Sequence, residues 1–388
     1  MNRKEFLKKF AMAGTAAMVI PSLAKANAFG LGTNKRLRVA VIGCGSVSGV
    51  YLPHLVRSPF VEVVAVCDIK PERAKQRAEE FHVPNQYPHI DKLLDGVDFD
   101  LLVNLTDMQE HGRLNKMALL KGKNVWSEKP LANSYREGYD LLQLSKKQGL
   151  RIWGAPAVVN SPQFAFMAKQ INEGKLGKVA AAHAHYGHLG PTWSAFFYEK
   201  GGGSLPDLGV YNLTTLSGLL GPVKSVVAMT NILTPERAVD DKGKIAVEAE
   251  DNASVLMEHE GGAISHVMCG FNYFDPYGHT GTGQDKPTIS LVGTRGAMHL
   301  IGYDWAPFAV EIATMDHEQP QRFATDTGSY VWQEGASVIS RSLVEGIEPL
   351  INAEHSLHVL EIIEAARESQ KERKRISLAS TFPYPVIK

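Results

Sequence analysis

Three side chains from two distant segments could together handle a proton. Lys129 stands in Glu128-Lys129-Pro130, just past a predicted strand, whereas Asp207 and Tyr211 stand four positions apart in the segment GGGSLPDLGVY. If a helix begins near Asp207, this spacing places the carboxylate and the phenol on the same side of it. A lysine, a carboxylate and a phenol that meet beside a hydride acceptor would form a proton-handling set suited to the oxidation of an alcohol.

A phenol needs electrostatic help before it can act as a base at neutral pH. Its ordinary pKa of about 10 is about three units too high, a free-energy gap of about 4 kcal/mol. One ammonium about 4 Å away contributes about that much at an effective dielectric constant of about 20. We therefore predict that Lys129 lowers the pKa of Tyr211, and that the two titrate as a coupled pair. Tyr211 would accept the hydroxyl proton, Lys129 would polarise the same oxygen, and Asp207 would bind or orient a neighbouring hydroxyl.

A glycine-rich turn upstream has the form of a nucleotide-binding site. The run Gly43-Cys44-Gly45-Ser46-Val47-Ser48 follows an apolar strand signal and opens a helix. Gly43 permits a tight turn, Gly45 lets the backbone approach a pyrophosphate, and the first N–H groups of the helix offer donors to that anion. The residues that we assign to cofactor binding here are Gly43, Gly45, Ser46, Val47 and Ser48. The alternative is a packing turn with no ligand.

An acidic residue after the next strand favours NAD as the ligand of this turn. Asp68 follows the strand predicted at residues 61–67, where a carboxylate meets the ribose hydroxyls of a dinucleotide. Such a carboxylate repels a 2′-phosphate, so we predict NAD rather than NADP. Lys70 and Arg73 lie close enough to the same position to keep NADP as the alternative.

Two sequence patterns divide the chain into the elements that must position these residues. Strand and helix signals alternate over residues 37–150, which favours βαβ units and a doubly wound parallel sheet. Beyond about residue 155, Gly-rich stretches of β-forming residues have the spacing of a large, mostly antiparallel sheet. We predict a Rossmann domain at residues 35–155 and a sheet domain for substrate binding and oligomerisation at residues 156–388.

The N-terminal residues have the three parts of an export signal. Basic side chains precede an apolar run that ends at Ile20, and Ala26-Asn27-Ala28 is a small-x-small cleavage site. The apolar run is too short, and too rich in Ala and Gly, to span a bilayer stably. Residues 1–28 also resemble the twin-arginine pattern of folded-protein export, except that Lys4 replaces the second arginine. We predict a periplasmic protein; an ordinary secretory signal and a membrane tether are the alternatives.

Composition limits the partners and assigns no special role to cysteine. The 388 residues are 44% hydrophobic, enough for a packed core, and Lys+Arg balance Asp+Glu at 41 each. This balance provides no field that attracts nucleic acid or an anionic membrane, which favours a small neutral ligand. The three cysteines stand at neither metal-ligand nor disulfide-framework spacing, and we predict that Cys44 and Cys67 are buried core residues.

Taken together, these segments resemble the Gfo/Idh/MocA family of oxidoreductases. The resemblance depends on the glycine turn, on Val125-Trp126-Ser127-Glu128-Lys129-Pro130-Leu131-Ala132 and on GGGSLPDLGVY, and Thr381-Phe382-Pro383 is similar to the C-terminal end of the family. It implies a Rossmann domain followed by an open-faced sheet domain, a nicotinamide cofactor, and a carbohydrate or polyol substrate. It also suggests a homodimer or homotetramer built through the open sheet.

The resemblance implies roles for several residues. Lys129 would contact the substrate and the cofactor, often before a cis proline. Thr106, His111 and Glu128 would lie near the cofactor. Tyr211 stands where many members of the family have a histidine. This tyrosine version is similar to the glucose–fructose oxidoreductase and dihydrodiol dehydrogenase branches, which implies Tyr211 as the acid/base.

Polar and aromatic residues after residue 180 suggest either a metal site or a sugar-binding wall. His183 and His185 alternate along a predicted strand and so share one face, with His188 nearby. No carboxylate cluster accompanies them, so we predict no metal and assign His183 and His185 to a polar sheet face or a substrate wall. Trp193 and Tyr198 could offer flat apolar faces to a sugar ring, or could equally be core or interface residues.

The export signal and the nucleotide turn are compatible if the cofactor travels with the protein. Outside the cytoplasm a dehydrogenase has no cofactor pool, so retention calls for a Kd of about 1 nM or below, or about −12 kcal/mol. We predict tightly retained NAD that is regenerated in place, for example by oxidising one sugar and reducing another. The alternatives are an NAD-dependent glycosidase, which oxidises transiently and then reduces again, and a non-catalytic sugar-binding protein with structural NAD.

Overall fold

The N-terminal part of the protein is built on a six-stranded parallel sheet. The structure is a computed structural model that describes residues 36–275, 285–324 and 330–387, so the predicted export signal at residues 1–28 lies outside the described residues. All neighbouring strands run parallel, in the order β3-β2-β1-β4-β5-β6 of a doubly wound fold. The strands are β1 Leu37–Ile42, β2 Val61–Cys67, β3 Asn85–Tyr87, β4 Leu101–Asn104, β5 Asn124–Ser127 and β6 Ile152–Gly154.

Helices with clear start signals connect these strands. Pro71 occupies the first turn of α3, where its missing N–H costs no hydrogen bond. The Ser134 hydroxyl caps α6 by accepting the N–H of Glu137 at 3.2 Å. The helices of this domain are α2 Ser48–Arg57, α3 Pro71–Phe81, α4 Ile90–Gly96, α5 His111–Leu120 and α6 Tyr135–Lys147.

The rest of the chain is built on a nine-stranded sheet in the order β16-β15-β14-β13-β7-β12-β11-β8-β17. Every neighbouring pair is antiparallel except β7 and β12, which run parallel. The predicted fold class, a Rossmann domain followed by a large and mostly antiparallel sheet, is therefore confirmed. The strands, with the separate hairpin β9–β10, are β7 Val179–Gly187, β8 Val223–Asn231, β9 Glu236–Val239, β10 Gly243–Ala246, β11 Asn252–His259, β12 Ile264–Gly270, β13 Pro287–Gly293, β14 Gly296–Tyr303, β15 Ala306–Thr314, β16 His317–Ala324 and β17 Ile376–Ser377.

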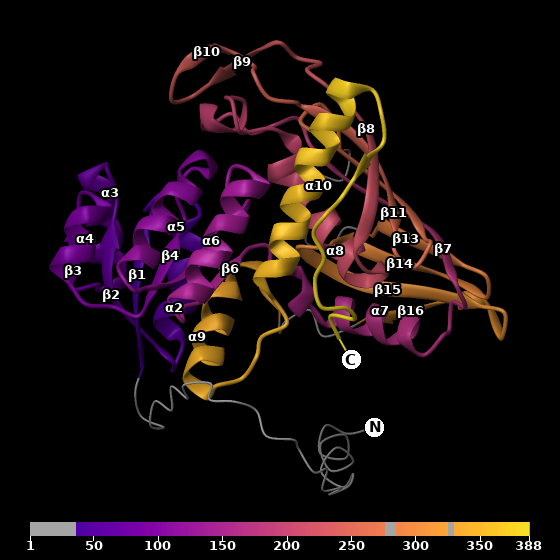
Figure 1. The fold of residues 1–388 in the computed structure, drawn as a ribbon, viewed down its shortest axis with the longest axis horizontal. Coiled ribbons are helices and arrows are strands. Elements are labelled where there is room, and N and C mark those ends of the chain that lie inside the picture. The colour runs from indigo at the N-terminus through magenta and orange to yellow at the C-terminus, as the bar shows by residue number, and fades with distance from the viewer. Residues whose placement is uncertain (1–35, 276–284, 325–329, 388) are drawn as a thin grey trace, which may run out of the picture.

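Helices of the second half hold the two sheets together. The α8 helix, Val210–Leu220, is buried along its whole length and packs on β7 and on α7, Pro162–Asn172. The α10 helix, Ala353–Glu372, contacts β8 on one side and α6 and β6 on the other, and Figure 1 shows it running between the two domains. The α9 helix, Gly335–Glu345, returns to the first domain and packs on α2 and β1. None of the helices in the described ranges is long and apolar enough to cross a membrane.

All three cysteines are free and buried. Cys44 and Cys67 are 3% and 1% exposed, which confirms the prediction that they are core residues. Burial raises the pKa of both thiols to about 12, so neither forms a reactive thiolate at neutral pH.

Candidate active site

Lys129 follows β5 at the carboxyl edge of the parallel sheet, where folds of this kind bind their ligands. Its peptide bond to Pro130 is cis, as the family resemblance implies. The carboxylate of Glu128 is buried; one oxygen accepts the N–H of Lys129 at 3.0 Å and the other accepts the hydroxyl of Tyr51 at 2.6 Å. These two hydrogen bonds fix the turn from which the Lys129 side chain leaves.

The Lys129 side chain forms a nearly buried ion pair with Asp207. Its Nζ lies 2.5 Å from Asp207 Oδ1 and 2.8 Å from the backbone oxygen of the same residue, and the two side chains are only 12% and 11% exposed. Asp207 belongs to a π-helical turn, Leu205–Gly209, that runs into α8; such turns are frequent at functional sites. The fold therefore joins a lysine and a carboxylate that are 78 residues apart in the chain.

Tyr211 lies beside this ion pair, but in an environment that differs from the predicted one. The Lys129 ammonium stands over the phenol ring, 5.2 Å from its centroid, and the ring is buried. Burial raises the pKa of Tyr211 well above its ordinary value, and the negative charge of Glu128 adds to this effect. The predicted lowering of the Tyr211 pKa is therefore wrong, because the charge of Lys129 is already compensated by Asp207 and burial dominates.

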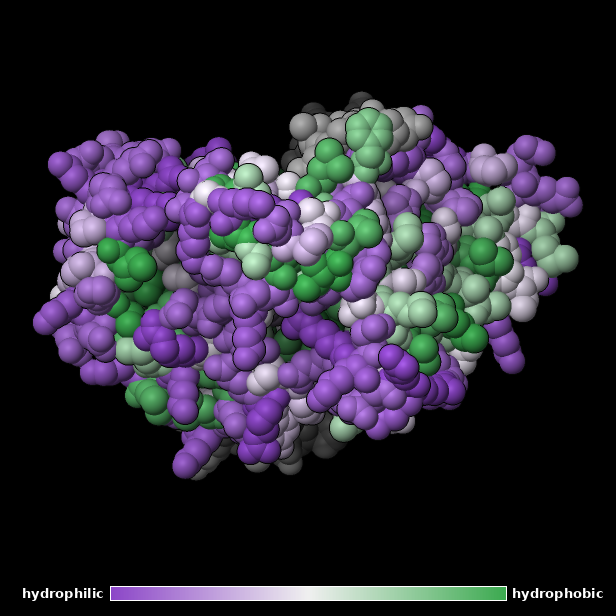
Figure 2. All heavy atoms as spheres, turned by 90° about the horizontal axis from the view of Figure 1, so that it is seen from above, coloured by the Kyte–Doolittle hydropathy of each residue, from purple (hydrophilic) through white to green (hydrophobic). Residues whose placement is uncertain are grey.

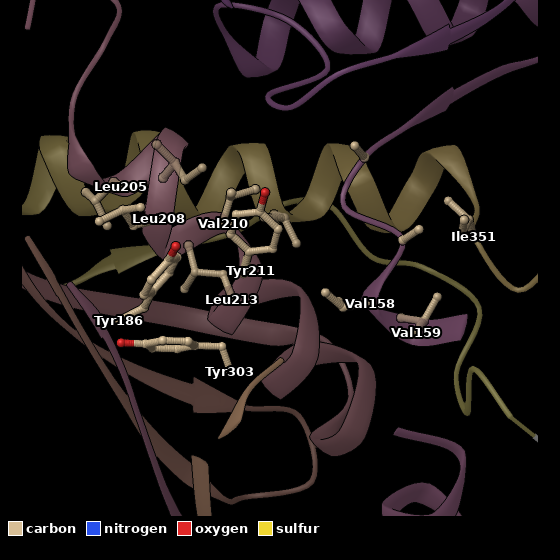
Figure 3. Packing of buried hydrophobic residues seen from close by; sticks show 14 of the residues in the cluster. Val158, Val159, Tyr186, Leu205, Leu208, Val210, Tyr211, Leu213, Tyr303 and Ile351 are labelled. Atoms are coloured by element: carbon tan, nitrogen blue, oxygen red, sulfur yellow. The ribbon is translucent and has the colours of Figure 1, made fainter. Parts of the chain in front are cut away.

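Aromatic side chains from three other segments surround Tyr211. The rings of Tyr186 and Trp332 meet it edge-on, with centroids 6.1 and 6.3 Å away. Tyr303 packs on Tyr186 at 4.7 Å and Trp305 stacks on Tyr303 at 5.5 Å. Figure 3 shows Tyr186 rising toward the helix that carries Tyr211, with the ring of Tyr303 lying across its base. The sequence reasoning missed this aromatic wall; the alternation of β7 is a signal for Tyr186, whereas Trp332 stands outside any periodic pattern.

The glycine turn has the geometry that a dinucleotide requires. Gly43 has a φ of +91°, and a Cβ there would lie 2.5 Å from the backbone carbonyl of Leu105. A Cβ on Gly45 would meet nothing closer than Arg73 Nη1 at 3.6 Å, so the surface of the turn is open. Since α2 begins at Ser48, its first N–H groups follow directly. These residues fit NAD, whose pyrophosphate they would hold with backbone N–H groups.

Asp68 is held at the edge of this turn by backbone N–H groups. Its two carboxylate oxygens accept the N–H of Cys44 and the N–H of Lys70, both at 2.8 Å. Arg77 supports the turn as well, donating to Ser48 Oγ at 3.0 Å and to a carbonyl oxygen of the turn at 3.2 Å. A carboxylate fixed in this way at the end of the second strand is suited to accept the ribose hydroxyls of NAD.

Gly43→Ala is expected to destabilise the protein more than Gly122→Ala. Both glycines have positive φ, +91° and +75°, so either substitution strains the backbone by about 1–2 kcal/mol. Only at Gly43 would the new Cβ collide with backbone, and we expect a total loss there of about 3 kcal/mol or more, together with weaker NAD binding. Urea unfolding of the two variants measures the difference, and equal losses would contradict the close approach of the turn to Leu105.

Thr106 and His111 are linked to the turn that carries Lys129. Thr106 Oγ1 donates to Asn104 Oδ1 at 2.7 Å, and the ring of His111 lies between the carbonyl oxygens of Thr106 (3.0 Å) and Pro130 (2.7 Å). Burial lowers the pKa of His111, so the neutral ring donates to one of these carbonyls at a time. The structure thus places both residues beside the candidate site, and their contact with the cofactor stays a prediction.

The histidines of β7 do not join the Lys129 centre. Along this strand Tyr186 faces Tyr211, so His183 and His185 point to the opposite, open side of the sheet. This corrects their assignment to a substrate wall, because strand alternation shows that two residues share a face but not which face it is. In the described ranges, no group of three or more His, Cys, Asp or Glu side chains is arranged to hold a metal ion.

Trp193 and Tyr198 differ in what they could offer a sugar. Tyr198 is 1% exposed and its hydroxyl donates to the carbonyl of Pro191 at 2.7 Å, so its ring is a packing residue, and its assignment to the substrate is corrected by its burial. Trp193 is 50% exposed and meets Phe196 edge-on at 5.5 Å. The carbonyl of Phe196 accepts a hydrogen bond from Gln109 of the first domain at 2.9 Å, so Trp193 lies where the two domains meet.

Two family models match the two domains of this chain. Residues 37–155 match the model described as "Oxidoreductase family, NAD-binding Rossmann fold", and residues 164–299 match the "GFO/IDH/MocA C-terminal domain". The chain belongs to the Gfo/Idh/MocA family. The resemblance drawn from the sequence is thereby confirmed.

Individual relatives and solved structures agree with this membership. A trans-1,2-dihydrobenzene-1,2-diol dehydrogenase from Bos taurus is 24% identical over 85% of this chain and 96% of its own length. The structure of an aldose–aldose oxidoreductase from Caulobacter crescentus superposes with a TM-score of 0.75 at 20% identity, covering 89% of this chain and 100% of that one. A levoglucosan dehydrogenase in complex with NADH gives a TM-score of 0.75 at 19% identity, with the same coverage. The predicted class of enzyme, an NAD-dependent oxidoreductase, is therefore confirmed.

Proposed function

We propose that this oxidoreductase transfers hydride between NAD and a hydroxyl-bearing carbon of a sugar, glycoside or polyol. The observation that carries the proposal is the Lys129–Asp207 ion pair beside Tyr211 at the carboxyl edge of the nucleotide-binding sheet. The names of the relatives support the substrate class, since they describe enzymes acting on aldoses, levoglucosan or a cyclic diol. Those names give no support to the glycosidase or to the non-catalytic sugar-binding protein.

The ion pair keeps hydrogen-bonding capacity for a substrate with adjacent hydroxyls. Asp207 takes two of the three N–H donors of Lys129, and the third has no acceptor in the part of the chain that the structure describes. Among the same residues, Asp207 Oδ2 has no donor. In the proposed mechanism Lys129 donates to the reacting oxygen, while Asp207 Oδ2 accepts the hydrogen of the neighbouring hydroxyl. This division of roles favours a vicinal diol as the group that is recognised.

Tyr211 supplies the proton or takes it up. Bound NAD would supply the hydride acceptor. Because burial raises the pKa of Tyr211, its phenol is protonated at neutral pH and can donate to a carbonyl oxygen during reduction. In the direction of oxidation the phenol must first lose that proton, so its basic form is scarce at neutral pH. Tyr211 therefore remains the acid/base of the proposed mechanism, with reduction favoured at neutral pH.

Trp193→Ala is expected to weaken sugar binding without slowing the chemistry. Stacking of a sugar on a half-exposed indole contributes about 1 kcal/mol, so KM should rise about fivefold at constant kcat. The matched control is Met315→Ala, which removes a 67% exposed side chain from the turn between β15 and β16 and should change neither constant. Unchanged KM in the Trp193 variant would assign this residue to packing or to an interface instead.

We further propose that the protein is exported with NAD already bound and works in the periplasm. The signal pattern of residues 1–28 supports export. The name aldose–aldose oxidoreductase, carried by one of the similar structures, describes a reaction between two sugars, and such a reaction would regenerate the bound NAD without a cofactor pool. The purified protein is expected to keep about one equivalent of NAD or NADH through dialysis, because retention needs a Kd of about 1 nM or below. Denaturing the dialysed protein and recording the absorbance of the released nucleotide measures this. A dialysed protein without nucleotide would contradict retention.

The proposed assembly is a homodimer or homotetramer that packs through the open face of the nine-stranded sheet. Helices α8 and α10 contact this sheet on one face, whereas the other face exposes apolar side chains. Contiguous apolar surface of this kind marks an interaction site in soluble proteins.

A further inference from the structure

The open face of the nine-stranded sheet combines large apolar side chains with uncharged polar ones. Over five adjacent strands, β13, β7, β12, β11 and β8, the outward apolar residues are 36–77% exposed. Figure 2 shows hydrophobic side chains gathered over this domain, toward the right of the view. The residues are Val227, Met229, Leu256, Ile264, Met268 and Val292. A face depleted of charge and rich in Met and aliphatic side chains has the composition of an interface core.

Histidines occupy the middle of this face. The strand β7 is fifth of nine in the sheet, and His183 on it pairs in register with His266 on β12. Their Nδ1 atoms lie 3.0 Å apart, and His266 Nε2 is 2.7 Å from the hydroxyl of Ser254. The ring of His185 stacks 5.9 Å from that of His183. The apolar side chains of β13, β12, β11 and β8 surround this cluster of three histidines.

A second copy of this chain is the occupant that fits. Five strands about 4.8 Å apart and three rows of side chains about 7 Å apart cover a plane of about 500 Å². Because side chains project from this plane, its accessible surface is larger than its flat area. It approaches the roughly 800 Å² of accessible surface that each partner buries in a stable interface. A two-fold axis places one patch against itself. Because the middle strand of the patch, β12, carries His266 beside His183, the histidines of the two copies would meet near the axis.

We propose that docking of the second copy requires the His183–His266 pair to be neutral, so that acid separates the copies. This inference depends on the assembly proposed above and adds its regulation. A hydrogen bond between two Nδ1 atoms needs one of them to be unprotonated and to act as the acceptor. This geometry therefore excludes a pair in which both rings are imidazolium ions. Across a two-fold interface, protonation would also bury like charges against one another.

The other charged groups of this face do not compensate such charges. In the described ranges, Glu258 of β11 pairs with Lys224 and Arg375, while the remaining charged pairs near the face are Glu311 with Arg322 and Asp275 with Lys286. On β14, His299 bonds to the hydroxyl of Ser290 and is the next titratable group in the row.

The direction of the pH effect follows from the histidines themselves. Burial lowers the pKa of His183, His185 and His266, and docking a second copy would bury them further. The neutral form therefore binds better. Dimerisation is therefore strongest at a pH above the pKa that the histidines have in the undocked protein. It weakens as the pH falls through that pKa. With one histidine titrating per copy, Kd should rise about 100-fold between about pH 7.5 and about pH 5.

Sedimentation velocity of the full-length protein with NAD bound, at these two pH values, tests the proposal. We expect a dimer at the higher pH and a Kd about 100-fold weaker at the lower one. The double variant His183→Gln/His266→Gln should lose most of the difference in Kd between the two pH values, whereas His89→Gln, an exposed histidine of the first domain, should keep the wild-type shift. Leu256→Arg should be monomeric at both, which locates the interface.

Three outcomes would overturn the proposal: a wild-type Kd that does not change with pH, a double variant that keeps the full shift, or a Leu256→Arg variant that still dimerises. Circular dichroism at the lower pH excludes unfolding as the cause of dissociation. Oxidoreductase activity, assayed on the same samples, tests the catalytic proposal separately, because the Lys129 centre lies on the other side of the sheet.

Discussion

Lys129→Met is expected to lower kcat about 1,000-fold while the protein stays folded and binds NAD. The substitution removes the ammonium that polarises the reacting oxygen, and losing one such interaction typically raises the barrier by about 3–4 kcal/mol. It also leaves Asp207 as a nearly buried carboxylate without its ion-pair partner, so the neighbouring hydroxyl of the substrate loses a correctly oriented acceptor. Steady-state kinetics with a panel of sugars and polyols measures the effect.

The matched control for this substitution is Lys121→Met. Lys121 forms an ion pair of similar length with Asp95, at 2.8 Å, but on the surface, where the two side chains are 53% and 69% exposed. Exposed pairs contribute little, so kcat should stay within about twofold of the wild type. A Lys129→Met enzyme that keeps more than a tenth of the wild-type kcat would show that Lys129 does not contact the reacting oxygen.

Sugar oxidation is expected to speed up about tenfold per pH unit from about pH 6 to about pH 9, whereas carbonyl reduction should stay level. The reason is the raised pKa of Tyr211, which leaves the phenolate as a minor species throughout this range and the phenol as the dominant one. Tyr211→Phe should reduce both rates about 100-fold and remove the pH dependence of oxidation. Initial rates in the two directions, recorded over this pH range, measure these effects.

Tyr139→Phe serves as the control for the phenol. Tyr139 is 39% exposed on α6, away from the Lys129 centre, so its substitution should leave both pH profiles unchanged. An oxidation rate that already levels off at about pH 7 would mean that Tyr211 is ionised there. In that case Lys129 would lower the phenol pKa, as the sequence argument held, and the raised pKa would not describe the working enzyme.

The nucleotide-binding half could be predicted in detail because its signals are local. The run Leu37–Ile42 is apolar and ends at glycine, and the turn that follows needs a positive φ at Gly43 that disfavours other residues. The conformation of this segment is therefore encoded within about a dozen residues. The strands β3 and β6 have only three residues each, too few for a periodic signal, so they emerge only in the sheet.

The residues of the candidate site could be predicted, whereas their electrostatics could not. Lys129, Asp207 and Tyr211 stand in recognisable segments, and the structure brings them together. The pKa of Tyr211 depends on how much water the surrounding rings exclude, and Trp332, one of these rings, comes from the segment between β16 and α9. The side on which His183 lies is likewise set by which face of the sheet the helices cover. The sequence around Tyr211 therefore does not determine its pKa, and the sequence around His183 does not determine which face of the sheet it occupies.

The most direct test of the Lys129 centre is a single-turnover experiment. Protein loaded with NAD is mixed with an excess of aldose or polyol in a stopped-flow instrument, and the near-ultraviolet absorbance of NADH is followed. We expect one exponential rise in the wild type and a rise about 1,000-fold slower in Lys129→Met, since only the chemical step is observed. A wild-type protein that forms no NADH with any substrate of the panel, or a variant that forms it at the wild-type rate, would contradict the assignment of catalysis to Lys129, Asp207 and Tyr211.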